Sequence, residues 1–374
     1  MKRVINLHSK SELIMKNINV VIKKIIFVLC LLFVGQVFSN EIQVNQQPRQ
    51  HYNEDEGYKN TAKDFENKTD ILALLWRYIS EDRIDAIPSK AIPLNKLTTK
   101  QLEQLPSDFD SLIRLGHSTI YLNLSGERWL IDPVFSERVS PFSFIGPKRF
   151  HQPPIALNQL PKLQGVIISH DHYDHLDKDS IKQLDKIAQV FIVPLGVNEH
   201  LKDWGISPSK IITLDWWQSF SINDVTITST PAQHFSGRGL FDKNETLWSS
   251  YVIQSKNSKL YFSGDSGYFK GFKEIGEKLG PFDLTMMETG AYDKQWVTIH
   301  MTPEETIQAH QDLKGKAILP IHNGTFDLAF HSWHEPLKRI HKLATKINIP
   351  ILTPIMGQVI TIDQSTKTRQ WWIE

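Results

Sequence analysis

Cysteine is almost absent from this sequence: the only one among 374 residues is Cys30, in an apolar stretch near the N-terminus. The chain therefore cannot form an internal disulfide, and the rest of it has no thiolate to act as a nucleophile or metal ligand. An excess of charge of one sign is also missing, because 42 Lys and Arg residues stand against 41 Asp and Glu residues. With no basic run interleaved with aromatic residues, the sequence gives no reason to expect a nucleic-acid partner.

A long hydrophobic segment is missing as well. The apolar run at residues 25–34 follows Lys16, Lys23 and Lys24 and ends shortly before the small and aliphatic residues at 37–39. A membrane-spanning helix needs about 20 apolar residues, whereas a basic leader followed by a short apolar run is typical of a secretory signal peptide. We therefore expect residues 1–39 to be a signal peptide and the mature protein to be secreted or periplasmic. An uncleaved membrane anchor is the alternative.

The rest of the chain has an ordinary globular composition, with 40% hydrophobic residues overall. Residues 40–69 are rich in Asn, Gln, Glu and Lys, as expected of a loose polar arm. Apolar residues at positions 71, 74, 75 and 78 then recur at helical spacing. We expect an N-terminal linker and helical extension over residues 40–110, followed by one domain over residues 111–374.

Strand and helix patterns alternate in this larger segment. Strand patterns at 111–124 and 128–135 lead into a proline-rich loop, and helix patterns at 178–188 and 196–206 are each followed by a strand pattern. A further helix is predicted to begin after Thr302, because Pro303 and Glu305 complete the signature of a capped start. The alternation predicts an α/β fold.

The most unusual stretch is SHDHYDHLD at residues 169–177, which follows a short apolar run. Its residues His170, His172, Asp174 and His175 form the pattern H-x-H-x-D-H. Imidazole and carboxylate groups are natural ligands of a divalent metal such as zinc. A solvated polar loop, or a patch that only responds to pH, would not require this spacing. The pattern therefore favours a metal site and contains enough donors for parts of two.

Other potential ligands also follow strand patterns. The runs at 225–233, 259–264 and 316–321 lead into His234, Asp265 and His322. Side chains just beyond the strand ends of an α/β sheet can converge on one crevice. Together with the strand before His170, these positions favour a single binuclear site over unrelated structural histidines.

In these motifs the chain resembles the metallo-β-lactamase superfamily, and within it the N-acyl-phosphatidylethanolamine-hydrolysing phospholipase D family. The matching blocks within residues 110–340 are DPVFSERVSPFSFIGPKRF, SHDHYDHLD, PAQHFSGRGLFDKNETLWSSYVI, GDSGY, IGEKLGPFDL, GAYD, HMTPEE and HNGTF. The resemblance implies an αββα sandwich, in which two mixed sheets pack face to face with helices outside. One departure is Asn323, where the family usually has Trp. It bears on the shape of the pocket, and hence on the substrate, rather than on the metal.

The resemblance also implies a set of metal ligands. One metal would be held by His170, His172 and His234, a second by Asp174, His175 and His322, and both by Asp265. The expected metals are two Zn²⁺ ions, with iron or manganese as alternatives. The implied nucleophile is a hydroxide shared by the two metals, with Asp265 fixing their separation and Asp174 orienting the hydroxide.

Two further residues, His300 and Asp132, have expected roles. The resemblance supports His300 as a substrate contact or proton donor to the leaving group, with simple packing or capping as the alternative. Asp132 is expected either to orient a ligand histidine or to serve as a turn residue before Pro133. Lys148 and Arg149 are left outside the site.

Aromatic residues near the proline-rich loop have two interpretations. Phe142, Phe144 and Phe150 either line a lipid-facing groove or pack in the core.

The function that the resemblance favours is a zinc-dependent phospholipase D-type phosphodiesterase that cleaves N-acyl-phosphatidylethanolamine-like lipids to phosphatidic acid. Its partner would be a phospholipid or another phosphodiester, reached through a peripheral membrane contact. The alternatives are a lactonase or small-molecule phosphodiesterase of the same superfamily, and a zinc-binding protein without catalysis. A closed structural zinc site fills its coordination with protein ligands, whereas this set leaves room for water and so favours an enzyme.

Overall fold

The structure of the protein, a computed structural model, describes residues 51–62, 65, 76–77, 80–363 and 366–373. The predicted signal peptide, the first part of the polar arm and most of the helix predicted near residues 71–78 lie outside the described residues. All elements given below belong to the unit Val44–Glu374. No helix in the described ranges has both the length and the apolar character needed to span a bilayer.

One sheet contains seven strands in the order β15-β3-β4-β5-β6-β7-β8. Their bounds are β3 (Ser111–Arg114), β4 (Ile120–Leu124), β5 (Glu127–Ile131), β6 (Leu163–Ile167), β7 (Ala188–Pro194), β8 (Ile211–Leu214) and β15 (Val359–Thr361). Neighbours from β15 to β5 are antiparallel, and those from β5 to β8 are parallel. The parallel half is the part in which helix and strand patterns alternate, because parallel neighbours need a crossover connection.

The second sheet contains six strands in the order β14-β13-β12-β11-β10-β9. Their bounds are β9 (Ser219–Ile222), β10 (Val225–Thr230), β11 (Ser250–Gln254), β12 (Lys259–Phe262), β13 (Leu284–Glu288) and β14 (Ile318–Ile321). Strands β9 to β12 pair antiparallel, and β12 to β14 pair parallel. A separate short hairpin joins β1 (Tyr52–Asn53) and β2 (Gly57–Tyr58).

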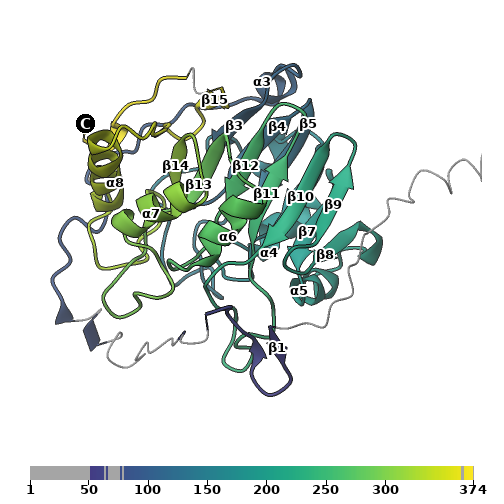
Figure 1. The fold of residues 1–374 in the computed structure, drawn as a ribbon, viewed down its shortest axis with the longest axis horizontal. Coiled ribbons are helices and arrows are strands. Elements are labelled where there is room, and N and C mark those ends of the chain that lie inside the picture. Colours follow the sequence, from purple (N-terminus) through teal and green to yellow (C-terminus); the bar gives the residue numbers. More distant parts are fainter. Residues whose placement is uncertain (1–50, 63–64, 66–75, 78–79, 364–365, 374) are drawn as a thin grey trace, which may run out of the picture. The chain divides into compact units, whose positions relative to one another are not determined.

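Helices cover the outer faces of the two sheets (Figure 1). The first sheet carries α3 (Thr99–Glu103), α4 (Lys178–Leu184) and α5 (Val197–Asp203), and the second carries α6 (Gly271–Lys278), α7 (Pro303–Asp312) and α8 (Glu335–Lys346). Three short 3-10 helices complete the described elements: η1 (Leu157–Gln159), η2 (Pro208–Lys210) and η3 (Trp371–Ile373). As expected, Thr302 caps α7 through a capping box with Glu305.

The main core lies between the two sheets. It combines apolar side chains of the first sheet, such as Trp129 and Ile167, with side chains of the second, such as Tyr251 and Leu260. Two further apolar clusters lie under the outer helices. Because burial of apolar surface is the main favourable term in folding, this arrangement explains the two-sheet sandwich, and it confirms the predicted αββα architecture.

Candidate metal centre

Five strand ends bring histidines and aspartates together between the two sheets. The first sheet contributes His117, which follows β3, and the segment 170–175, which follows β6. The second sheet contributes His234, Asp265 and His322, which follow β10, β12 and β14. Segments far apart in the sequence thus meet because each strand delivers its last residues to the same end of the sandwich.

The first group of donors consists of His170, His172, His234 and Asp265, whose ligand atoms all lie within 4.8 Å of one another. Nδ1 of His172 lies 3.0 Å from Nε2 of His170 and 3.2 Å from Nε2 of His234. Burial lowers the pKa of His170 and of His234 well below the ordinary value, so both rings are neutral. Neutral imidazoles are the form that binds a metal.

The Nδ1 atoms of His170 and His234, which point away from the donor group, each have a hydrogen-bond acceptor. Nδ1 of His170 lies 2.9 Å from Oγ of Ser169, whose hydroxyl donates to Asp132, and Nδ1 of His234 lies 3.0 Å from the carbonyl of Ile299. Each Nδ1 therefore carries the hydrogen, and the Nε2 atoms point their lone pairs inward. Converging lone pairs repel unless a cation lies among them, so this donor set fits a divalent metal.

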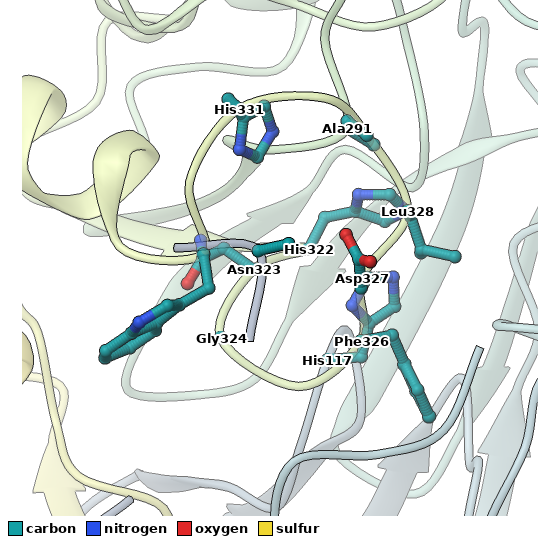
Figure 2. A pocket seen from close by; sticks show the side chains of 12 residues that line it. His117, Ala291, His322, Asn323, Gly324, Phe326, Asp327, Leu328 and His331 are labelled. Atoms are coloured by element: carbon teal, nitrogen blue, oxygen red, sulfur yellow. The ribbon is translucent and has the colours of Figure 1, made fainter. Parts of the chain in front are cut away.

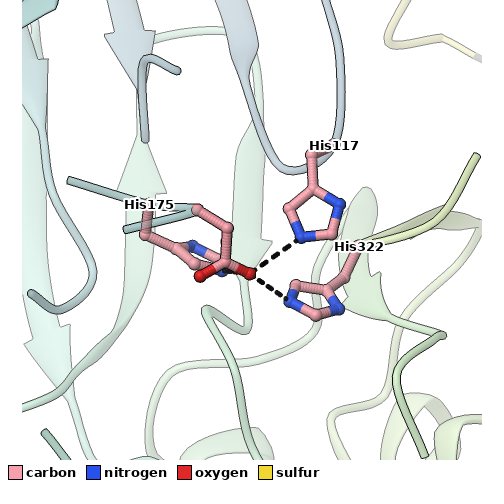
Figure 3. Close-up of side chains that lie close together, drawn as sticks. His117, His175 and His322 are labelled. Atoms are coloured by element: carbon pink, nitrogen blue, oxygen red, sulfur yellow. Dashed lines mark hydrogen bonds and ion pairs between the residues drawn. The ribbon is translucent and has the colours of Figure 1, made fainter. Parts of the chain in front are cut away.

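The second group consists of His117, Asp174, His175 and His322 (Figure 3). Oδ2 of Asp174 lies 3.2 Å from Nε2 of His117 and 3.2 Å from Nε2 of His322. Burial lowers the pKa of His117 to about 3. Burial also disfavours the charged form of His322, but the nearby carboxylates Asp265 and Asp174 raise its pKa to about 10. These carboxylates therefore attract positive charge, which a divalent metal would supply without a proton.

Asp265 joins the two groups. Its Oδ1 lies 3.1 Å from Nε2 of His175, and its Oδ2 lies 2.9 Å from Nε2 of His322. The same Oδ2 lies 3.9 Å from Nε2 of His170 and 3.9 Å from Nε2 of His234. Burial opposes ionisation of Asp265, but its histidine neighbours hold its pKa well below the usual range. Although they lie 3.1 Å apart, Oδ1 of Asp265 and Nε2 of His175 are buried and form no hydrogen bond with each other or with any other described residue, so a shared metal would supply their partner.

Asp132 contacts the second group through Nδ1 of His175, the ring nitrogen that faces away from the other donors. Its Oδ2 lies 2.7 Å from Nδ1 of His175, and its Oδ1 accepts a 2.7 Å hydrogen bond from the backbone N–H of Ser169. Asp132 and His322 both have positive φ angles, of 40° and 61°. Such strained backbone is typical of functional sites. Of the two roles expected for Asp132, the geometry favours the orientation of a ligand histidine.

His300 lies beside the metal-ligand groups and pairs with a buried acid. One of its ring nitrogens lies within 4.8 Å of ligand atoms of Asp265 and His322. Its Nδ1 lies 2.5 Å from Oε1 of Glu288, the last residue of β13. Burial raises the pKa of Glu288, and the interaction and hydrogen bond with His300 oppose that rise.

A small cavity of about 20 Å³ lies behind the second group and is lined by His117, His322 and His331 among others (Figure 2). The Nδ1 atoms of His117 and His322 are buried there without a hydrogen-bond partner among the described residues. The cavity has room for about one water molecule. The side chain of Asn323 does not fill it, because its amide donates to the carbonyls of Thr289 and Ile321.

A larger groove of about 790 Å³ begins beside the metal-ligand segment. Tyr173, which stands between two predicted ligands, lines it together with Arg138, Lys178, Trp204 and Arg238. Two loops that border the groove expose large apolar side chains: Phe142 is 56% exposed, Phe144 78%, Ile145 58%, Leu240 91% and Phe241 93%. Exposed apolar patches of this kind mark surfaces that meet another apolar phase or partner.

The structure brings together all seven ligands predicted from the sequence, and His300 lies with them. Their catalytic and metal-binding roles stay predictions. Lys148, left outside the site, forms an exposed ion pair with Glu137, and Arg149 is buried. Phe142 and Phe144 are exposed, whereas the partly buried Phe150 packs in a cluster with Trp371.

Two residues of the site were missed by sequence reasoning. His117 had a usable signal, because GHS follows a strand pattern just as the other donors do. Glu288 had no usable signal, since a single polar residue at the end of an apolar strand is common before any loop.

Comparisons with known proteins agree with this geometry. The family model described as "Beta-lactamase superfamily domain" matches residues 127–323. An uncharacterized protein of Mycobacterium tuberculosis (strain H37Rv) is 44% identical over 261 residues, which is 69% of this chain and 70% of the relative. The N-acyl-phosphatidylethanolamine-hydrolyzing phospholipase D 1 of Caenorhabditis elegans is 35% identical over 291 residues, which is 74% of this chain and 81% of the relative.

Solved structures show the same fold. The isothiocyanate hydrolase from Delia radicum gut bacteria superposes with a TM-score of 0.54 at 18% identity, over 67% of this chain and 98% of that one. The chain therefore belongs to the beta-lactamase superfamily and carries histidine and aspartate clusters able to bind the metal of a metal-dependent hydrolase.

Proposed function

We propose that this protein is a two-metal phosphodiesterase of the phospholipase D type, which cleaves N-acyl-phosphatidylethanolamine-like phospholipids on the headgroup side. The observation that carries the proposal is the position of Asp265, whose two oxygens face histidines of both donor groups. A carboxylate shared in this way supports two metals close together, as in two-metal phosphoryl-transfer sites. Zinc is the expected metal, with iron or manganese as alternatives.

The donor groups define where the chemistry would occur. A metal pair bound there would supply Lewis-acid chemistry, polarising a phosphoryl oxygen and making a water molecule more acidic. The protein contributes orientation: Asp132 and Ser169 hold the ligand rings, and Asp174 places a carboxylate at the edge of the second group. His300 stands beside both groups, where it can pass a proton to the leaving oxygen.

The lipid substrate is proposed on two grounds. The relative from Caenorhabditis elegans is named for hydrolysis of N-acyl-phosphatidylethanolamine, and the identity covers most of both chains. The exposed Phe142, Phe144, Leu240 and Phe241 also lie on loops beside the groove that reaches Tyr173. We propose that these loops form the peripheral membrane contact through which a phospholipid enters.

The proposed cellular location is based on the N-terminal segment. The basic leader and apolar run at residues 16–34 support export, so we propose a secreted or periplasmic protein. A membrane anchor formed by an uncleaved segment would serve the same substrate.

Lipid mass spectrometry tests this function directly. The zinc-loaded protein is incubated with N-acyl-phosphatidylethanolamine or phosphatidylethanolamine in mixed micelles, and phosphatidic acid is measured. We expect phosphatidic acid from the wild type and none from His172→Ala, which removes the nitrogen that lies between His170 and His234.

His341→Ala is the matched control, because His341 lies on α8 outside both donor groups. It should retain the wild-type rate. Hydrolysis of a soluble phosphodiester with no change in either lipid would leave the metal site standing and overturn the lipid assignment.

A further inference from the structure

Glu288 is a fully buried carboxylate at the end of β13 that no metal-ligand group uses. Placing an acidic group in the interior is costly unless partners compensate for the lost water. Glu288 has two such partners: Oε2 accepts a 2.7 Å hydrogen bond from the backbone N–H of Ser266, and Oε1 lies 2.5 Å from Nδ1 of His300.

The backbone N–H and carbonyl of Glu288 are both hydrogen-bonded, as are the two oxygens of its side chain. Its N–H donates to Oγ of Ser263 at 2.8 Å, and its carbonyl accepts from Oγ1 of Thr306 at 2.9 Å. Glu288 also pairs with Ile321 in the sheet, one residue before the predicted ligand His322. The carboxylate is therefore fixed relative to the metal-ligand groups and can act as a rigid support.

This support determines how His300 presents its ring. The ring lies 5.2 Å from that of His234 and 5.3 Å from that of His322, measured between centroids. With Nδ1 engaged by Glu288, Nε2 is the nitrogen left for a substrate, and it makes no hydrogen bond with any described residue. The side chain of His300 is 13% exposed, so a substrate in the site can reach it.

We propose that Glu288 is a positioning residue, which holds the Nδ1–H of His300 on its carboxylate and directs Nε2 to the leaving oxygen of the substrate. The inference rests on the proposed phosphodiesterase function and assigns the leaving-group side of the site. A carboxylate that fixes the tautomer and orientation of an imidazole is a recurrent device in acid–base catalysis.

The proton balance of the step is simple. The water oxygen forms a new P–O bond while the P–O bond to the headgroup breaks, and the electron pair of that bond stays on the leaving oxygen. The lone pair on Nε2 of His300 accepts a proton from the attacking water, and Nε2 then passes this proton to the leaving oxygen. His300 keeps its Nδ1–H on Glu288 throughout, so the step consumes water alone.

The first test reads the tautomer of His300 without measuring activity. Two-bond ¹H–¹⁵N correlation spectra are recorded on zinc-loaded protein labelled with ¹⁵N-histidine, and His300→Gln identifies the signals of His300. We expect the His300 ring of the wild type to carry its hydrogen at Nδ1. In Glu288→Gln we expect a mixture of the Nδ1–H and Nε2–H tautomers. A wild-type ring with its hydrogen on Nε2 alone would overturn the proposal.

The second test compares two lipids that differ only in the leaving group. N-acyl-phosphatidylethanolamine releases a basic alkoxide that needs a proton, whereas phosphatidyl-4-nitrophenol releases a weakly basic phenolate that does not. General acid catalysis contributes roughly 10²–10⁴-fold, so Glu288→Gln should lower kcat on the first lipid about 100-fold. On the second lipid the loss should stay below about 3-fold, because no proton transfer is lost.

Thr289→Val is the matched control, since Thr289 directly follows β13 and is also fully buried, but its hydroxyl donates to the carbonyl of Met287 and not to His300. It should lower kcat on both lipids by the same factor or leave both values unchanged. In a His300→Gln background, Glu288→Gln should cause no further loss on the ethanolamine lipid, because the two residues act as one unit.

Equal slowing of both lipids by Glu288→Gln would refute the positioning role while leaving the phosphodiesterase function in place. If the wild type cleaves neither lipid, the proposed function fails, and the tautomer measurement alone then decides whether Glu288 orients His300.

Discussion

Oδ2 of Asp132 lies 2.7 Å from Nδ1 of His175, and both side chains are completely buried. The same carboxylate receives the backbone N–H and the hydroxyl of Ser169, which in turn accepts from Nδ1 of His170. One aspartate therefore orients ligands of both donor groups. The Nε2 atoms of His170 and His175, which are the predicted metal-binding atoms, are consequently held in place by the protein itself.

Asp132→Asn should weaken metal binding without unfolding the protein. The amide has nearly the same shape, but it presents a donor or a weaker acceptor to His175 and no longer enforces the Nδ1–H form. Substitution of such partners typically lowers metal affinity by about 10–100-fold. Competition with a chelator of known zinc affinity measures the change.

Asp110→Asn provides the control, because Asp110 is likewise buried but accepts from Ser125, Ser255 and Ser258 outside the donor groups. Its zinc affinity should match the wild type. An Asp132→Asn protein that binds zinc as tightly as Asp110→Asn would show that Asp132 does not orient the ligands.

The exposed loops beside the groove should control contact with lipid. Burial of one phenylalanine stabilises by about 1.5–3 kcal/mol when complete, and insertion into a bilayer is partial. The double substitution Phe144→Ser/Phe241→Ser should therefore weaken vesicle binding by about 10–100-fold. Co-sedimentation with phosphatidylethanolamine-containing vesicles gives the partition coefficient.

Ile347→Ser tests whether any exposed apolar side chain has this effect, because Ile347 is 44% exposed at the end of α8, away from these loops. It should bind vesicles like the wild type. Hydrolysis of a soluble diester should be equal in all three proteins; unchanged vesicle binding by the double variant would exclude these loops as the lipid contact.

His310 should contribute to acid sensitivity. Burial lowers the pKa of His310 to about 4, and its Nδ1 lies 2.7 Å from Oγ1 of Thr285. An unfolded histidine has a pKa of about 6.5. Between about pH 6.5 and 4, His310 therefore binds a proton in the unfolded chain but not in the folded protein. The free energy of unfolding therefore falls as the pH drops from about 6.5 to 4 and has no such loss above that window.

His310→Gln removes this proton uptake while keeping a polar group near Thr285. Between pH 8 and pH 5, the variant should lose about 2 kcal/mol less unfolding free energy than the wild type. Urea titrations at the two pH values measure the difference, and loss of metal in acid affects both proteins alike. Equal losses would show that His310 is protonated in the folded protein.

The sequence predicted the donor-bearing strand ends because each consists of a local apolar run followed by a polar residue. The H-x-H-x-D-H segment after β6 and the residues His234, Asp265 and His322 all carry that pattern. The capped start of α7 was predictable for the same reason, since Thr302, Pro303 and Glu305 are neighbours in the chain.

Features that depend on long-range contacts were harder to predict. The helix pattern at 178–188 continues further than α4, which ends at Leu184 because Ala188 pairs with Leu163 in the sheet. The role proposed for Glu288 depends on its contacts with His300 and Ser266. These residues are distant in the sequence and reach Glu288 only through sheet pairing and loop packing. The αββα arrangement itself came from family resemblance, because periodicity does not say how two sheets stack.

Asp265, proposed as the residue shared by two metals, is central to the proposed function. Metal content per chain, measured by mass spectrometry of purified wild type and Asp265→Asn after zinc loading and removal of excess zinc, tests it directly. We predict two zinc ions in the wild type, and fewer than two together with loss of phosphodiesterase activity in the variant. One zinc ion in the active wild type, or two in a fully active Asp265→Asn protein, would contradict the account.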